Sequence, residues 1–299
     1  MLTVAMIVKN EEQFIEKVIG NVQPVADEIV ITDTGSTDRT ADIIEKLNVR
    51  LFHYSWNGDE ARARNFTLSK CKTDWILFID ADEFIDIRDY QKIRKLLSGE
   101  NGYIAYRIFL RHYIDPAMEF KNLYQKDWKG SYILHSIIRI FKNGEGIFFS
   151  RPAYAALDES LRARIDKVGN SNIVFHHLDI LRNKQKRSEK ARWYYDDVFK
   201  NLKMSPIDPE VNYVVAHYYR LHGQFAKAVK FYKRTLSINP KHIKARLSLG
   251  LCYVMLGKEA EGLKIIKTLR ENPNIHLGEI GSYLNTAYSI IATRMSVTK

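Results

Sequence analysis

Residues 75–83 read WILFIDADE, and this stretch decides the fold. Its first five residues, Trp75–Ile79, are continuously apolar, which is typical of a parallel strand that is buried on both faces. Three acidic residues, Asp80, Asp82 and Glu83, follow directly. Ligands of open α/β sheets bind beyond the carboxyl ends of the strands. The stretch therefore predicts a buried strand that delivers carboxylates to a ligand site at a sheet edge.

The residues before this stretch alternate between strand and helix patterns. Residues 28–32, EIVIT, are β-branched and bounded by turn residues, as expected for a second buried strand. Such alternation predicts a parallel sheet with helices on both faces. The other expected strands are residues 3–8 and 49–54, and the expected helices are residues 11–22, 40–47 and 61–69.

The middle of the chain follows a different pattern. Residues 103–113 and 132–141 are rich in aromatic and β-branched side chains, which predicts an extension of the sheet. Between them, residues 115–130 are polar with scattered aromatic side chains. We expect this segment to be a long loop over the site.

From about residue 183 the pattern is helical and repeats every 34 residues. Tyr219 and Tyr253 are 34 apart, and Ala228 and Gly262 show the same spacing. A helix–turn–helix unit of this length resembles the tetratricopeptide repeat (TPR), although a generic helical bundle is the alternative. The expected domains are residues 1–182, an α/β domain, and residues 183–299, an all-α TPR-like domain with a terminal helix over residues 282–293.

The net charge of +11 over 299 residues is unevenly distributed. Residues 1–180 hold 24 Lys+Arg and 26 Asp+Glu, whereas residues 181–299 hold 22 and 9, a balance of +13. The excess lies away from the expected site, so nucleic acid is not expected as a partner. We expect the basic repeats to dock an anionic acceptor or a membrane surface, or only to present a solvated face. Self-association through the repeats is a further expectation.

The amino-acid composition argues against several other classes of protein. The 45% hydrophobic and 27% charged residues are ordinary for a globular protein and argue against disorder. Two distant cysteines, Cys71 and Cys252, fit a reducing compartment and exclude a cysteine-based zinc site. The apolar start is too short for a signal peptide, and no run is long enough to span a bilayer. We expect a cytoplasmic protein, at most peripheral to the inner face of the membrane.

Three clusters could carry chemistry. Asp33 ends a strand and precedes Gly35, a position suited to ligand binding but also to a simple turn. Asp80 and Asp82, two residues apart on extended backbone, would point the same way and hold Mn²⁺ or Mg²⁺, unless they only begin a helix. Asp158-Glu159 and His176-His177 could supply a base and a metal ligand, or serve only structure.

These residues together resemble family 2 glycosyltransferases of the nucleotide-sugar-binding GT-A fold. The resemblance rests on MIVKNEEQFIEKVIGNV, ADEIVITDTGSTDRTADI and WNGDEARARNFTLSKCKTDWILFIDADE, and it returns in IRIFKNGEGIFF and IVFHHLDILRN. The most similar subset carries C-terminal TPRs and includes lipopolysaccharide-core sugar transferases and peptide S-glycosyltransferases. The resemblance implies a GT-A domain with a mixed or parallel sheet, followed by helical repeats.

The resemblance also implies roles for single residues. The donor nucleotide sugar would be held by Val8, Glu11, Asp33, Arg64, Asp80 and Ala81. Asp82 and His177 would bind the metal, with Asp80 contacting either ribose or metal. Glu159 would be the general base, but because Asp158 stands where the family usually has histidine, Asp158 is the alternative.

The expected activity is an inverting, metal-dependent transfer of a sugar, with UDP-hexose as the default donor. The acceptor would be a glycan, a lipid-linked molecule or a peptide. Two other classes are open. A nucleotidyltransferase would need a glycine-rich phosphate loop, but residues 9–12 read KNEE. A non-catalytic TPR adaptor would leave the sugar-nucleotide domain vestigial, although the intact Asp80 and Asp82 argue against such decay.

Overall fold

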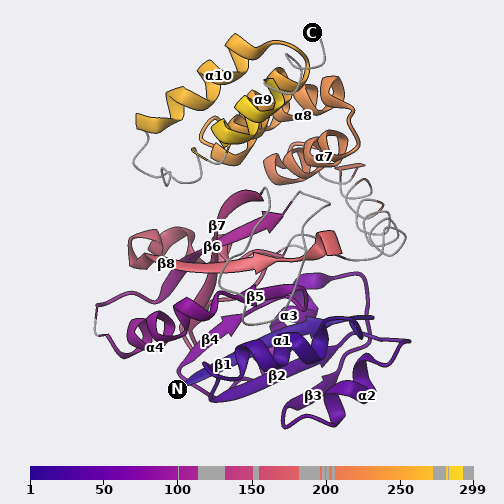
Figure 1. Cartoon of the computed structure of the whole chain (residues 1–299), viewed down its shortest axis with the longest axis vertical. Helices are drawn as coiled ribbons and strands as arrows, with labels where there is room; N and C mark the ends of the chain where they lie inside the picture. Colours follow the sequence, from indigo (N-terminus) through magenta and orange to yellow (C-terminus); the bar gives the residue numbers. More distant parts are fainter. Residues whose placement is uncertain are drawn as a thin grey trace. The chain divides into compact units, whose positions relative to one another are not determined.

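The computed structural model describes residues 1–99, 101–113, 132–150, 155–181, 196, 199, 202–203, 206–271, 281 and 283–291 (Figure 1). The chain forms two compact units, Met1–Arg182 and Asn183–Lys299. The loop expected over residues 115–130 lies outside the described residues.

The first half of the N-terminal unit alternates strand and helix, which confirms the predicted pattern. Its elements are β1 (Leu2–Val8), α1 (Ile15–Val22), β2 (Glu28–Asp33), α2 (Thr40–Glu45), β3 (Arg50–His53), α3 (Glu60–Leu68) and β4 (Trp75–Phe78). The four strands are parallel, and Val8 at the end of β1 is in register with Asp33 at the end of β2. The register therefore brings the carboxyl ends of these strands to one edge.

The second half of the unit extends the sheet with antiparallel pairs. Its elements are β5 (Glu83–Ile85), α4 (Tyr90–Ser98), β6 (Ala105–Tyr113), β7 (Tyr132–Lys142), α5 (Asp158–Leu161) and β8 (Val168–His177). β7 pairs antiparallel with β4 and β6, while β8 runs parallel to β6. The strand order is β3-β2-β1-β4-β7-β6-β8-β5, so the sheet is mixed, as the fold class predicted.

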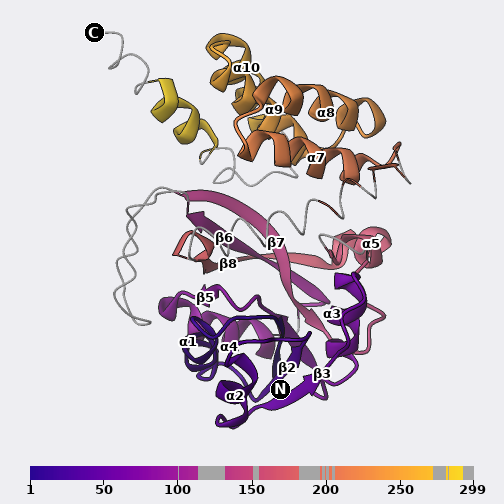
Figure 2. The ribbon, with the colours of Figure 1, turned by 90° about the vertical axis from the view of Figure 1, so that its right-hand side faces the viewer.

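Helices cover both faces of the sheet because alternate strand residues point in opposite directions. Val4 and Met6 of β1 belong to the same buried cluster as Ile15 of α1 and Ile93 of α4. Ala5, between them, belongs instead to a second cluster, which also contains Ala61 of α3, and Leu157 and Leu161 beside and in α5. Figure 2 shows α3 and α5 on one side of the sheet and α1 and α4 on the other.

The sheet is curled, and the connection from β4 to β5 shows this. In strand order β5 is four places from β4, which would be about 19 Å in a flat sheet. Only residues 79–82 join the two strands, and they form a turn in which the Glu83 amide donates to the Asp80 carbonyl at 3.0 Å. So short a link requires the β5 edge of the sheet to curve back toward the central strand β4. The turn that closes the curl contains Asp80 and Asp82.

The C-terminal unit consists of paired helices, as the 34-residue period predicted. They are α7 (Pro209–Leu221), α8 (Phe225–Ile238), α9 (Ile243–Met255) and α10 (Glu259–Lys267), and residues 283–291 form a further helix. Asp208 caps α7 by accepting hydrogen bonds from the amides of Glu210 and Val211, and Pro209 occupies the first turn. In the part of the chain that the structure describes, no helix has the length and apolarity needed to cross a bilayer.

Candidate functional site

The loops after β1 and β2 form one preorganised wall of the site. The Asp33 carboxylate accepts hydrogen bonds from the amides of Gly35 (2.9 Å) and Ser36 (2.8 Å), and Gly35 has a φ of 101°. Asp33 therefore does shape the turn, as its alternative interpretation predicted. Asp33 is nearly fully buried at the edge where β1 and β2 end. Both of these hydrogen bonds use Asp33 Oδ1. The expected contact with the nucleoside would therefore use the other carboxylate oxygen, Oδ2.

The loop after β1 is tied to the loop after β2 by several hydrogen bonds. Asn10 takes a left-handed φ of 57°, its amide donates to Ser36 Oγ at 2.9 Å, and its Oδ1 accepts from the Thr37 amide at 2.7 Å. The Glu11 amide donates to Thr40 Oγ1 at 2.7 Å. The carbonyl of Val8 accepts from Thr34, which leaves the position of this backbone fixed before any ligand binds.

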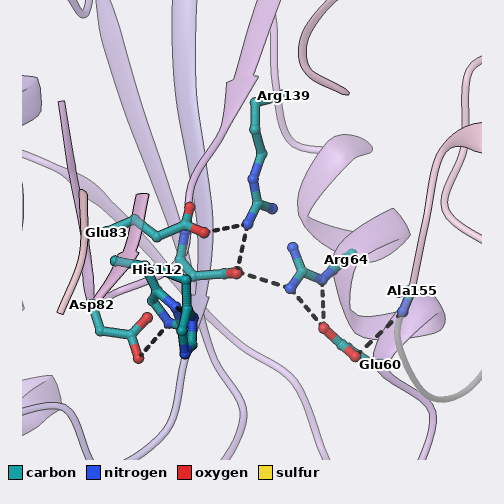
Figure 3. A network of polar contacts seen from close by, with 9 residues as sticks. Glu60, Arg64, Asp82, Glu83, His112, Arg139 and Ala155 are labelled. Carbon is teal, nitrogen blue, oxygen red and sulfur yellow. Dashed lines mark hydrogen bonds and ion pairs between the residues drawn. The ribbon is translucent and has the colours of Figure 1, made fainter. Parts of the chain in front are cut away.

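Two arginines hold the carboxylate of Asp80 (Figure 3). Arg64 Nη2 donates to Asp80 Oδ1 at 2.8 Å, and Arg139 Nη2 donates to Asp80 Oδ2 at 2.8 Å. Burial alone would raise the pKa of Asp80, but Arg139 and then Arg64 hold the pKa of this carboxyl well below its usual range. Asp80 is therefore an anion clamped between two cations.

Arg64 and Arg139 are themselves positioned by further carboxylates. Glu60, one turn before Arg64 on α3, accepts from its Nε and Nη2 at 2.8 and 2.6 Å. Arg139 on β7 donates to Glu83 at 2.5 Å as well as to Asp80. Burial raises the pKa of Glu83, and Arg139 opposes this without cancelling it. Both guanidinium side chains are about nine-tenths buried, at 8% and 11% exposed.

Asp82 has a different partner from Asp80. The backbone turns at Ala81 and Asp82, so the expectation that the two carboxylates point the same way from extended backbone is not met. Asp82 Oδ2 lies 3.4 Å from His177 Nε2, while Asp80 contacts the arginines. The antiparallel pairing of β5 with β8 brings this about, since it places Glu83 opposite His177. Two residues predicted to bind the metal, Asp82 and His177, are thus adjacent.

A second histidine contacts His177 from β6. His112 Nδ1 and His177 Nδ1 are 2.8 Å apart. Burial favours neutral His177, but the carboxylate of Asp82, followed by Glu83, raises the pKa of His177 to about 9.

His176 belongs to a different cluster from His177. Successive strand residues point to opposite faces, and His176 is fully buried on the other side of β8. Its Nδ1 is 2.8 Å from the Tyr113 hydroxyl and its Nε2 is 3.3 Å from Asp86 Oδ2. Burial lowers the pKa of His176 against the pull of Asp86. The structural interpretation of the histidine pair therefore fits His176.

The candidate base lies on α5, and residues that precede α5 are tied to α3. Asn65 exchanges two hydrogen bonds of 2.8 Å with the backbone of Phe149, and the Ala155 amide donates to Glu60 at 3.4 Å. Glu159 is exposed, and its carboxylate has no hydrogen bond or ion pair among the described residues. The side chain of Asp158 lies outside the described residues. The structure does not bring Glu159 into the network of Asp80 and Asp82.

Two side chains of the site could act as metal ligands. The described residues contain no group of three or more histidine, cysteine, aspartate or glutamate side chains that could hold a metal. Asp82 and His177 remain as two adjacent ligands, one oxygen and one nitrogen. Mg²⁺ commonly takes only one or two protein carboxylates and completes its shell with substrate phosphates and water. The pair fits such an ion if a bound diphosphate supplies further oxygens.

Sequence reasoning missed Arg139 and His112. Both lie in strands of the middle section, far in sequence from the acidic stretch they contact. Arg139 carried a usable signal, because it is a lone cation inside the apolar run Ile137–Phe141. A charge that is buried in a strand requires a partner.

Two family models match the chain. The model described as Glycosyl transferase family 2 matches residues 3–161. The model described as Anaphase-promoting complex, cyclosome, subunit 3, matches residues 184–269. The first covers more than half of the chain and nearly all of the N-terminal unit, and the second falls within the helical unit.

Individual proteins are also similar. A TPR repeat-containing protein of Synechococcus elongatus is 28% identical over 182 residues, which are 61% of this chain and 41% of that protein. An uncharacterized glycosyltransferase of Rickettsia bellii is 37% identical over 107 residues, 35% of this chain and 36% of that protein. These matches span less than half the length of either relative. Among solved structures, S. aureus TarS 1-349 in complex with UDP-GlcNAc is 14% identical, with a TM-score of 0.47 and 90% of each chain covered.

Proposed function

The chain belongs to glycosyl transferase family 2, and from this premise we propose that it transfers a sugar from a nucleotide-diphosphate donor to an acceptor. The observation that carries the proposal is the adjacency of Asp82 and His177, 3.4 Å apart, beside an Asp80 clamped by two arginines. Asp80 and Asp82 lie at the turn after β4, whose neighbours in the sheet are β1 and β7. Anionic and cationic groups at such an edge suit a nucleotide diphosphate.

We propose that the donor is a UDP-linked hexose. Val8, Glu11, Asp33 and Ala81 would surround the nucleoside, and Asp80 would contact the ribose. Arg64 Nη1 and Arg139 Nε are buried N–H groups without a hydrogen-bond partner among the described residues. Unpaired buried donors are costly, and diphosphate oxygens would satisfy them. Arginine is well suited to this task because its charge is permanent and its donors are fixed in a plane.

Asp82 and His177 would hold a Mn²⁺ or Mg²⁺ ion. Such an ion, when bound, neutralises the charge that develops on a diphosphate leaving group. The protein's own part is to keep this pair in place, which it does through the pairing of β5 with β8 and the contact of His177 with His112. The neighbouring network of Arg64, Asp80 and Arg139 keeps further positive charge beside the same phosphates.

A carboxylate of α5 would act as the general base. Glu159, with Asp158 as the alternative, takes the proton of an acceptor hydroxyl or thiol while the acceptor atom attacks the anomeric carbon. The bond from that carbon to the diphosphate oxygen breaks with both electrons leaving on oxygen. A single displacement inverts the anomeric configuration. Because Glu159 is exposed, this step requires substrate to bring the acceptor to α5.

The helical unit would bind the acceptor. We propose a glycan, lipid-linked or peptide acceptor, docked through a region whose balance of charge is +13 over residues 181–299. The same charge would favour an anionic membrane surface and a cytoplasmic protein peripheral to it. Paired TPR-like helices commonly bind proteins, and self-association through them is part of the proposal.

Substitution of Asp82 tests the metal-linked part of the site. We expect Asp82→Asn to lower Mn²⁺-dependent release of UDP from a UDP-sugar panel by about 100-fold or more, because it removes one of two ligands. Calorimetric titration with Mn²⁺ and UDP should show the same loss without relying on turnover. The exposed Asp74→Asn serves as control. Full Mn²⁺ affinity in Asp82→Asn would remove Asp82 from the site.

Substitution of Glu159 tests the base. We expect Glu159→Gln to lower the transfer rate by about 10²- to 10⁴-fold while UDP binding is unchanged, because only proton transfer is affected. Asp158→Asn is the matched comparison. If only Asp158→Asn lowers the transfer rate, Asp158 is the general base. If the wild-type protein binds UDP-sugars yet neither hydrolyses nor transfers any of them, the alternative of a non-catalytic TPR adaptor would be favoured.

A further inference from the structure

One face of helix α8 carries only positive charge. Residues 211–258 contain nine lysine and arginine residues and no aspartate or glutamate. Four of these cations lie on α8 and are exposed, and we call them the cationic strip: Lys227, Lys230, Lys233 and Arg234. None of the four forms an ion pair in the part of the chain that the structure describes. The charge of the strip is therefore not cancelled within the fold.

The strip occupies the whole solvent side of the helix. Its members are three or four residues apart, which places them side by side on a helix surface. Ala228 and Tyr232 lie on the other side and are fully buried. The remaining exposed residues of α8 are Ala226, Ser237 and Ile238. A helix of 14 residues is about 20 Å long, so the strip presents four positive charges over a surface of that length.

The next repeat shows that helix packing does not require this charge. α10 begins 34 residues after α8 and has the same place in its helix pair. The positions that correspond to Lys227, Lys230, Lys233 and Arg234 hold Glu261, Lys264, Lys267 and Thr268. These four positions carry +4 on α8 and +1 on α10. The strip is therefore a property of one helix, not of the repeat.

The side chains of the strip suit a bilayer surface better than other polyanions. Three of the four are lysines, whose ammonium groups act as point charges on flexible stems. The exposed residues of α8 include no amide side chain to read a base edge and no aromatic ring on which a base could stack. An anionic bilayer presents continuous charge that demands no fixed spacing of cations, and clusters of about four to eight lysines and arginines are typical of proteins that bind it.

We propose that the cationic strip of α8 docks the protein on the anionic surface of a phospholipid bilayer. The attraction is electrostatic, because Ile238, at 38% exposed, is the single large apolar side chain on the exposed side of the helix. The docking should weaken with salt, which shortens the Debye length from about 10 Å at 0.1 M to about 3 Å at 1 M. It builds on the proposed membrane association by naming the surface that makes contact, and it does not require that the chain transfers sugar.

Vesicle binding by the full chain tests the docking. The protein is sedimented with mixed vesicles of phosphatidylcholine and phosphatidylglycerol, and pure phosphatidylcholine vesicles are the uncharged comparison. We expect binding to the mixed vesicles alone, and its loss in about 1 M salt. Release of UDP from UDP-sugars, measured without vesicles, reports sugar transfer separately. Transfer without vesicle binding would refute the docking alone, and vesicle binding without transfer would refute the transferase alone.

Two double variants remove equal charge from different helices. Lys230→Gln with Arg234→Gln, on α8, should weaken binding to mixed vesicles about tenfold or more, since each cation near an anionic surface contributes about fivefold. Lys264→Gln with Lys267→Gln, on α10, should change this binding by no more than about twofold, because charges away from the contact are screened. Circular dichroism checks that both variants are folded.

Four outcomes would overturn the proposal. They are failure of the wild type to bind mixed vesicles, equal binding to uncharged vesicles, equal weakening by the two double variants, and binding of a DNA duplex at an ionic strength at which mixed vesicles do not bind. The last outcome would assign the strip to nucleic acid.

Discussion

Arg139 determines how the acidic residues of the site are arranged. Its guanidinium contacts Asp80 and Glu83 together, and Asp80 also contacts Arg64. Without the arginine, the buried carboxylate of Glu83 and the half-buried carboxylate of Asp80 would face one another within one turn. The arginine, together with Arg64, thus outweighs the burial that would otherwise raise the pKa of Asp80.

Arg139→Gln should therefore be strongly destabilising. We expect the free energy of unfolding in urea to fall by about 3–5 kcal/mol, because removing one partner leaves buried charge uncompensated. The matched control is Arg164→Gln, which removes a more exposed pair with Glu145 and should cost about 0–1 kcal/mol. Equal losses for the two variants would show that the Arg139 contacts contribute no more than a surface pair.

At the scale of single residues, the sequence predicts what lies close along the chain. Asp80 and Asp82 could be singled out because they follow a strand directly, and Arg64 because it accompanies them in a family pattern. The sequence could not predict that Asp80 contacts arginines while Asp82 contacts His177. These contacts depend on the turn at residues 81–82 and on side chains from strands β7 and β8. Contacts between residues so far apart in the chain produce no pattern in the sequence around either residue.

At the scale of elements, hydrophobic pattern was sufficient for the long strands and helices. β1, β2, β4 and the helices between them agree with the pattern to within a few residues. The sequence did not predict β5, because the strand has only three residues and begins within the acidic motif. It is too short to show an alternation of apolar and polar residues. The place of β8 between β6 and β5 was equally hidden, because parallel pairing joins segments far apart in sequence.

The crossing of α9 and α10 depends on two glycines. A Cβ at Gly262 would lie 2.4 Å from the carbonyl oxygen of Gly250 and 2.7 Å from Val254. Gly262→Ala should therefore lower the free energy of unfolding by about 1–3 kcal/mol, since overpacking outweighs the better helix propensity of alanine. Thermal unfolding followed by circular dichroism measures the change.

A second glycine provides the comparison for this variant. A Cβ at Gly281 meets nothing within 4 Å, so Gly281→Ala should leave the melting temperature unchanged or raise it. A Gly262→Ala variant as stable as Gly281→Ala would show that the two helices can separate without loss. The close approach would then not contribute to the stability of the repeat.

At the scale of the whole molecule, each unit contains one buried cysteine. Cys71 belongs to the N-terminal unit and Cys252 to the helical unit. Burial raises the pKa of each thiol from 9.0 to about 12. Because both folded-state values are raised, the stability linked to these thiols is fully present below about pH 9. It is lost as the pH rises from 9 toward 12, where the unfolded thiols ionise first.

Thiol labelling should therefore report on each unit. In the native protein at pH 8, we expect reaction with an aromatic disulfide to be slow for both thiols, and fast after unfolding in urea, because the thiolate is the reactive form. Cys71→Ala and Cys252→Ala assign each phase to its unit. Rapid native labelling of one thiol would show that its surroundings open readily.

The curled sheet has a consequence for how the protein is made. Asp80 and Asp82 emerge from the ribosome early, yet His177 and the strand that carries it follow almost one hundred residues later. At about 5–20 residues per second, translation leaves the acidic turn without its histidine for about 5–20 seconds. During that interval β6 lacks β8, and a nascent chain with an unpaired strand edge is a substrate for chaperones. The protein would acquire its complete candidate site only as synthesis turns to the helical repeats.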